Sequence, residues 1–210
     1  MTGRRKKKFE SIKTVLLYVA LIFMAFIMLI PFAWMISASL KLEKDVFSFP
    51  IVWIPEDPQW SNYKEIWQKV PLLTGFFNSI KLTVVVTVLQ FITSALAAYA
   101  FAKLEFKGKN IIFMMYIMTI AIPWQVYMVP QYKMMTFLGL TDSHLGIILM
   151  HTFTATGVFL MRQFFMGIPE DLLEAARIDG LSEYGIWAKL ILPLSKPVIA
   201  TLCITSFTFE

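Results

Sequence analysis

The sequence predicts an all-α fold, a polytopic bundle of membrane-spanning helices. Of its 210 residues, 58% are hydrophobic and only 16% are charged, and the mean hydropathy is +0.67. The charged residues gather in short segments between long apolar runs, as expected because a charged side chain is costly in hydrocarbon. This balance lies outside the usual range for a soluble globular domain.

Four apolar runs are long enough to cross a bilayer, since a spanning helix needs about 20 residues. A fifth run begins at Val198 and is cut off at Glu210, so we expect a chain that is truncated at its C-terminus. Prolines in or beside the runs, Pro31, Pro123 and Pro130, should kink or end helices. The four complete runs are residues 14–38, 75–102, 111–129 and 145–161.

Small residues in two of these runs indicate where neighbouring helices approach closely. A small side chain lets two helix backbones come near each other in a membrane. The residues that we expect at such contacts are Gly157, Ser94, Ala95, Ala97 and Ala98.

Lysine and arginine in the short connections predict the orientation of the chain. The N-terminal arm, residues 1–13, has a basic cluster directly before the first span, and the 103–110 connection has three lysines against one glutamate. These features place the N-terminus, the 103–110 connection and residues 162–197 in the cytoplasm. Residues 39–74, with near-balanced charge and several tryptophans, are expected to form an extracytoplasmic loop; the transmembrane domain as a whole is 14–210.

Composition also argues against several other functions. The net charge of +5 reflects membrane topology and does not indicate nucleic-acid binding, because the densest basic cluster precedes a span. Cys203 is the single cysteine, which excludes a disulfide within the chain. No metal-ligand cluster, catalytic triad or phosphate-binding loop is present, so a nucleotide site would have to lie in another chain.

The predicted spans contain no Asp or Glu, whereas proton-coupled carriers usually place acids at membrane depth. His151 is the ionisable candidate in the fourth span. Two interpretations are open: a neutral histidine hydrogen-bonded to a neighbouring helix, or a group that lines a solute path. Trp124, Tyr127 and Tyr132 could similarly stack on sugar rings or anchor the chain at the interface. No substrate-contacting set is predicted.

A polar segment, residues 168–197, separates two apolar runs. Pro169 suits a first helical position and is followed by two acidic residues, which favour the positive end of a helix dipole. Gly180 fits the left-handed position that ends a helix. Ser182 can cap a second helix, expected to stop before Pro193. The segment therefore predicts two short helices joined by a tight turn.

Helices this short are not stable alone, so they must pack on the spans, on a partner, or on both. From the residues, two interpretations remain. The segment could be an amphipathic connection at the membrane surface. Alternatively, it could dock in a groove, where Ala175 and Ala176 allow close approach and Glu174 offers a charge to a basic residue.

The segment resembles the EAA motif of ABC importer permeases, and its extended form EAARIDG resembles the carbohydrate branch. Similar stretches elsewhere, such as FAKLEFKGKN and FLMRQFF, extend the resemblance over most of the chain. It is closest to the smaller permease of maltose-type sugar importers. The matching positions are Glu174, Ala175, Ala176, Asp179, Gly180, Leu192 and Pro193, with Leu190 where isoleucine is usual.

This resemblance implies a non-hydrolytic, multi-pass permease subunit of the plasma or inner membrane, with six spans and no cofactor of its own. The matching residues would form a coupling element that docks on a cytoplasmic ATPase dimer, which binds ATP-Mg. A second homologous permease and an extracytoplasmic solute-binding protein would complete an importer, most readily for sugars. The alternatives are an importer for polyamines or phosphate esters, an ion-coupled secondary carrier, or a non-transporting membrane anchor.

Overall fold

The computed structural model describes the backbone of residues 2–209 and the side chains of residues 12–209. Within that range all regular structure is helical. The chain forms two compact units, residues 1–73 and 74–210. The all-α prediction is confirmed.

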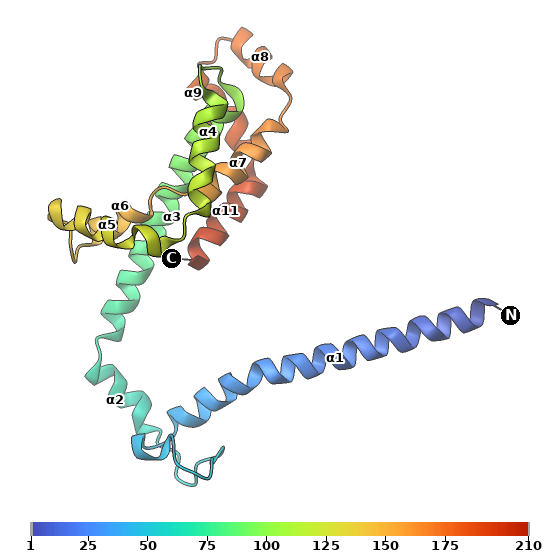
Figure 1. Cartoon of the computed structure of the whole chain (residues 1–210), viewed down its shortest axis with the longest axis vertical. Helices are drawn as coiled ribbons and strands as arrows, with labels where there is room; N and C mark the ends of the chain where they lie inside the picture. The colour runs from blue at the N-terminus through green and yellow to red at the C-terminus, as the bar shows by residue number, and fades with distance from the viewer. Residues whose placement is uncertain (1, 210) are drawn as a thin grey trace. The chain divides into compact units, whose positions relative to one another are not determined.

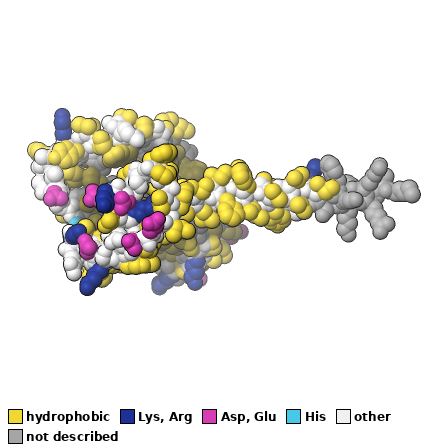
Figure 2. Space-filling view, turned by 90° about the horizontal axis from the view of Figure 1, so that it is seen from below, with side chains coloured by type: hydrophobic (Ala, Val, Ile, Leu, Met, Phe, Trp, Pro, Cys, Tyr) yellow, Lys and Arg dark blue, Asp and Glu magenta, His cyan; other side chains and the backbone are white. Residues whose placement is uncertain are grey.

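The first unit consists of one long helix and a capped loop. Helix α1 (Thr2–Ser39) continues through Pro31 without ending, so the basic arm and the first span are one helix. Its apolar side chains are exposed along its described length (Figure 2). A short 3-10 turn, η1 (Glu43–Asp45), and helix α2 (Ser61–Lys69) follow.

The second unit is a helical bundle (Figure 1). Helix α7 packs against α4 and α11, while α5 and α6 extend to one side. The helices of its membrane part are α3 (Leu72–Lys103), α4 (Lys109–Met118), η2 (Thr119–Ala121), α5 (Trp124–Phe137), α6 (His144–His151), α7 (Ala155–Met166) and α11 (Lys196–Phe209).

The polar segment between α7 and α11 contains four short elements. These are α8 (Glu170–Ile178), α9 (Glu183–Ile186), a π-helical turn η3 (Trp187–Ile191) and α10 (Leu192–Leu194). The prediction that the second helix stops before Pro193 is wrong, because the helical path runs on to Leu194. A π-helical turn ends at Ile191, two residues before the proline, so the missing N–H of Pro193 falls close to where the hydrogen-bond pattern already changes.

Two of the predicted spans are bent, and the chain bends again where the polar segment meets α11. Helices α4 and α5 meet at 102°, α6 and α7 at 43°, and the α9–α10 path meets α11 at 81°. Among the described residues, two single helices are long and apolar enough to cross a membrane, or up to five spans if each bent pair counts as one. The first bend occurs at Pro123, as its missing donor predicts. Pro130, by contrast, lies inside α5.

The break between α6 and α7 is held open by polar side chains of α3. Gln90 Nε2 donates to the carbonyl of His151 at 2.7 Å, and Thr93 Oγ1 donates to the carbonyl of Thr152 at 3.0 Å. Thr154 then caps α7 by accepting from the N–H of Gly157. Carbonyl groups released by the break thus find partners within the bundle, which is the condition for an interrupted helix at membrane depth.

The core joins α3, α7 and α11 to the polar segment. Three helices approach one another closely at Gly157: a Cβ there would lie 2.6 Å from Ser94 Oγ and 3.0 Å from Leu202 Cδ1. The prediction of close approach at Gly157 and Ser94 is confirmed. The buried hydrophobic residues of this core are Ala95, Ala98, Tyr99, Met161, Phe165, Ile168, Leu173, Ala176, Ile186, Ile191, Val198 and Leu202.

Candidate functional site

The polar segment forms the two-helix element that its sequence predicts. Gly180 has φ +81°, a conformation that side-chain-bearing residues rarely adopt, and its N–H donates to the carbonyl of Arg177 at 3.0 Å. Ser182 Oγ accepts from the N–H of Gly185 at 3.2 Å and so caps α9. The predicted turn and cap are both confirmed.

Helix α8 is fixed to the bundle by one face. Leu173 is fully buried and Ala176 is 8% exposed, and both belong to the core that includes α3 and α7. Ala176 therefore packs within its own chain. Of the two motif alanines, Ala175 is the one that lies on the exposed surface.

The opposite face of α8 is exposed and mixes apolar with acidic side chains. Ile178 is 86% exposed and Leu172 is 44% exposed, although isoleucine and leucine are usually buried. Asp171, Glu174 and Asp179 are exposed around them. We call this surface, formed by Asp171, Leu172, Glu174, Ala175, Ile178 and Asp179, the outer face of α8.

The exposure of Ile178 was not predicted from the sequence. Helical spacing does separate two faces of α8. Ala175 and Ile178 are three residues apart and share one face, while Leu173 and Ala176 share another. Which face meets the bundle depends on where α3 lies.

Arg177 balances the acidic residues at the two helix starts. Its Nη1 lies 3.2 Å from Glu170 Oε1, and its Nε lies 2.9 Å from Glu183 Oε1. The hydrogen bond from Arg177, and a second one from a tyrosine hydroxyl, hold the pKa of Glu183 below its usual value. The same carboxylates, Glu183 foremost, raise the pKa of Arg177 above its ordinary range. Arg177 is therefore occupied within the chain, whereas Glu174 is in no ion pair that the structure shows.

The remaining motif residues lie beyond the turn. Asp179 follows α8 and is exposed. Leu192 and Pro193 form α10, and the chain turns into α11 directly afterwards at Ser195, whose N–H donates to the carbonyls of Ile191 and Leu192. Leu192 and Pro193 therefore lie where the chain returns to the bundle, at some distance along the chain from the outer face of α8.

Connections at this end of the bundle meet one another. Lys103, at the end of α3, donates to the carbonyl of Ile168 at 2.6 Å and to Glu170 Oε2 at 3.2 Å. The 103–110 connection and the polar segment therefore lie on the same side of this unit.

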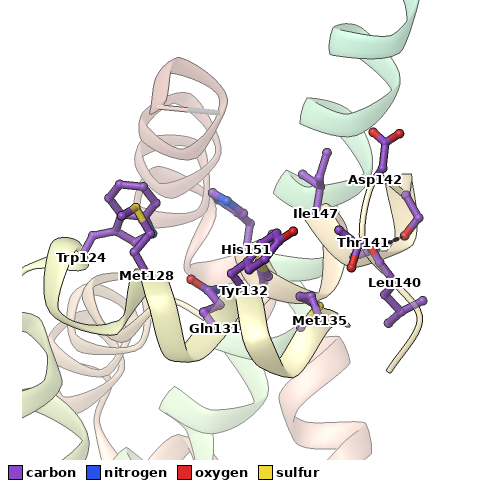
Figure 3. Close-up of a pocket in the computed structure, with 13 residues that line it drawn as sticks. Trp124, Met128, Gln131, Tyr132, Met135, Leu140, Thr141, Asp142, Ile147 and His151 are labelled. Atoms are coloured by element: carbon purple, nitrogen blue, oxygen red, sulfur yellow. Dashed lines mark hydrogen bonds between the residues drawn. The ribbon is translucent and has the colours of Figure 1, made fainter. Parts of the chain in front are cut away.

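A cavity of about 320 Å³ lies between α5, α6 and the turn that joins them (Figure 3). Trp124 and Tyr132 line it from α5, and His151 lines it from α6. Gln131 and Asp142 add an amide and a carboxylate. Aromatic faces beside a few polar groups are the usual lining of a small-molecule site. Tyr127 is not among the lining residues.

These features are those of a multi-pass helical membrane protein with a polar two-helix element on one side. Residues 90–209 match the family of binding-protein-dependent transport system inner membrane components, and the chain belongs to this family. It is a permease subunit of an ABC importer; it is not an enzyme, and ATP hydrolysis belongs to a separate chain. A permease of this family works with an ATPase and a solute-binding protein.

Several known proteins are similar over most of the chain. The arabinooligosaccharides transport system permease protein of Halalkalibacterium halodurans is 33% identical over 202 residues, which are 95% of this chain and 72% of that protein. The sn-glycerol-3-phosphate transport system permease protein of Pectobacterium atrosepticum is 34% identical over 173 residues, covering 80% of this chain and 62% of that protein.

A solved structure has the same fold. It is a bacterial ABC transporter involved in the import of the acidic polysaccharide alginate. One of its chains superposes with a TM-score of 0.80 at 28% identity, covering 99% of this chain and 72% of that chain.

Proposed function

We propose that this chain conducts a sugar across the inner membrane and that its outer face of α8 docks in a cleft of the partner ATPase. The observation that carries the docking proposal is the pair of opposite faces on α8. Leu173 and Ala176 bind the helix to the bundle, while Ile178 and Glu174 project from it. An exposed isoleucine ringed by acidic residues fits an apolar socket with a basic rim.

In this proposal each motif residue has its own role. Ala175 permits close approach, and Glu174 and Asp179 pair with basic residues of the socket. Gly180 makes the turn, Ala176 holds the helix to its own bundle, and Leu192 and Pro193 return the chain to the membrane. The ATPase would form a dimer, and a second homologous permease would complete the path. The N-terminus is assigned to the cytoplasm from its basic cluster.

Photo-crosslinking tests the docking. A benzophenone amino acid replaces Ile178 in the assembled complex, and another replaces Phe137, which is 89% exposed at the end of α5. Position 178 should trap the ATPase and position 137 should not. Equal trapping at both positions, or none at 178, would contradict the proposal.

Substitution of Gly180 tests the coupling. Proline cannot adopt φ +81° and has no N–H for the carbonyl of Arg177. Gly180→Pro should therefore abolish solute-stimulated ATP hydrolysis and uptake in the reconstituted complex. Gly180→Asn is the control, because asparagine tolerates the left-handed region. Wild-type coupling in the proline variant, or uptake driven by an ion gradient without any ATPase, would refute the proposal.

The solute class is supported by the similar proteins, which are named for the transport of arabinooligosaccharides and the import of alginate. A phosphate ester is the second candidate, because another relative is named for sn-glycerol-3-phosphate. Uptake of radiolabelled saccharides and of sn-glycerol-3-phosphate in a deletion strain separates the two. In the proposal the cavity contacts the imported saccharide. Trp124→Ala and Tyr132→Ala should then raise the KM for uptake of that saccharide. Tyr127→Ala, outside the lining, is the matched control.

A further inference from the structure

Five side chains connect the polar segment to the end of α3 in a series of contacts that the backbone of α3 closes into a ring. Each of two glutamates, Glu170 and Glu183, uses one carboxylate oxygen to bind Arg177. Each uses its other oxygen to bind α3: Glu170 Oε2 lies 3.2 Å from Lys103 Nζ, and Glu183 Oε2 lies 2.5 Å from the hydroxyl of Tyr99. We call this ring of Tyr99, Lys103, Glu170, Arg177 and Glu183 the α3 clamp.

The clamp spans the glycine turn. Glu170 is the first residue of α8 and Glu183 is the first residue of α9, so Arg177 joins the starts of both helices. Tyr99 and Lys103 are four residues apart on α3 and therefore lie on one face of that helix. Both short helices are thus tied to α3 at their first residues.

Charge and burial show that the clamp is complete within the chain. The clamp has two cations and two carboxylates, so its net charge is zero. The side chain of Lys103 is 5% exposed, and Tyr99 is 5% exposed, while Arg177, Glu170 and Glu183 are between 36% and 46% exposed. Ion pairs between side chains this exposed add little stability individually. The main effect of the ring is therefore to fix the geometry of the two short helices against α3.

Helix α3 is the element best suited to carry a displacement across the membrane. It runs for 32 residues without a break, whereas the other apolar paths of this unit, within residues 74–209, bend by 43°, 81° and 102°. A push on a continuous helix reaches its far end, whereas a push on a bent path can be absorbed at the break.

We infer that the α3 clamp transmits the motion of the docked α8 to α3, and that Arg177 and Tyr99 are positioning residues for transport. This inference rests on the proposed docking of α8. Apolar contacts of Leu173 and Ala176 hold α8 against the bundle, and the clamp gives its movement a direction along α3.

The test measures coupling in the reconstituted complex as ATP hydrolysed per solute imported. Arg177→Lys keeps the charge but loses the planar fork that reaches both glutamates, and Tyr99→Phe removes only the hydroxyl. Both should raise the ratio by about two- to fivefold, the range expected from loosening partly exposed charge-assisted contacts. Tyr184→Phe is the matched control, because Tyr184 is 77% exposed and lies outside the clamp.

A double-mutant cycle separates the clamp from general loosening. Tyr99→Phe and Glu183→Gln break the same contact, so their effects on the ratio should not add. Glu183→Asp, which retains the charge, should restore part of the coupling.

A direct readout of movement uses the outer end of α3. A Cβ at Gly75 meets nothing within 4 Å, so Gly75→Cys can carry a spin label in a Cys203→Ser background, paired with Phe137→Cys. The inter-label distance should change on addition of a non-hydrolysable ATP analogue in the wild-type clamp, and the change should shrink with Arg177→Lys. An unchanged distance response and an unchanged ratio in assembled complexes overturn the inference. If position 178 still traps the ATPase and Gly180→Pro still uncouples, the clamp alone is rejected and the docking proposal stands.

Discussion

The two polar connections that flank the membrane helices are stabilised in different ways. Residues 168–197 bury Leu173 and Ile186 completely and bind α3 through one ion pair, Lys103 with Glu170, and one hydrogen bond, Tyr99 with Glu183. Residues 40–71 bury no residue of η1 or α2 and are held mainly by side chains that bind backbone carbonyls next to the end of α1. The first connection is fixed to a span far away in the sequence, whereas the second caps the helix from which it emerges.

The cap is centred on Lys41, a lysine only 6% exposed. Its ammonium donates to the carbonyl of Val52 and lies 4.5 Å from the ring centroid of Trp34. Asn62 Nδ2 donates to the carbonyls of Ser39 and Lys41, each at 3.0 Å. Carbonyl groups at the end of α1 thus gain donors from the loop, as a helix C-terminus requires. This difference supports the proposed coupling: burial and side-chain contacts join the first connection to a distant helix, whereas carbonyl capping makes the second a local stop.

The largest effect should follow removal of the apolar anchor of α8. Leu173→Ala deletes a fully buried side chain and should cost about 2–5 kcal/mol of stability. Leu172→Ala, at a side chain 44% exposed, should cost well under half as much. Two measurements compare the variants: the thermal unfolding of the purified complex, and the amount of ATPase that the complex contains. Equal effects would show that α8 is not anchored by burial.

The next effect concerns the cap. Lys41→Met removes the donor to the Val52 carbonyl and should cost about 1–3 kcal/mol, the usual penalty for a polar group left unsatisfied. Limited proteolysis should then cut residues 47–57 faster, while coupling between ATP hydrolysis and uptake stays normal in the molecules that remain intact. Lys44→Met, at an exposed lysine, is the control. A change in coupling without faster proteolysis would refute the assignment of the cap to a local role.

A smaller effect is expected at the start of α9. Ser182→Ala removes the oxygen that accepts from Gly185 N–H and should cost about 0.5–2 kcal/mol. Ser182→Asn, which also caps, should recover most of it. Hydrogen exchange of residues 183–187 in the complex is the measurement, and equal protection in all three proteins would argue against a role of this cap.

Local rules made several features predictable from sequence. Gly180 and Ser182 were identified because a left-handed turn and a helix cap each depend on a few adjacent residues. The bend at Pro123 follows from the missing N–H of proline. The break at residues 152–154 has no such signal, since Gln90 and Thr93 hold it from about 60 residues away in sequence. Helix α7, which follows the break, ends at Met166, five residues beyond the end of the predicted apolar run.

Neighbouring residues of similar chemistry were also beyond sequence reasoning. Leu172 and Leu173, or Ala175 and Ala176, cannot be assigned to the surface or the core until the position of α3 is known. The partners of Glu183 were not predicted either, because Tyr99 lies 84 residues earlier. Composition and motif thus identified the segment, whereas tertiary packing decided what each side chain does.

The smallest effect is expected for an exposed ion pair within the cap. Lys69 Nζ lies 2.7 Å from Glu65 Oε2 on α2, and the two side chains are 73% and 48% exposed. The pair lowers the pKa of Glu65 and raises that of Lys69, yet water and salt screen such pairs strongly. Lys69→Ala should leave proteolysis, unfolding and coupling unchanged, whereas Arg177→Ala, whose pairs tie two helices to a buried lysine, should disturb coupling. If Lys69→Ala proved as disruptive as Arg177→Ala, ion pairs at the two connections would be equivalent, and the contrast between a connection built for transmission and one built as a stop would fail.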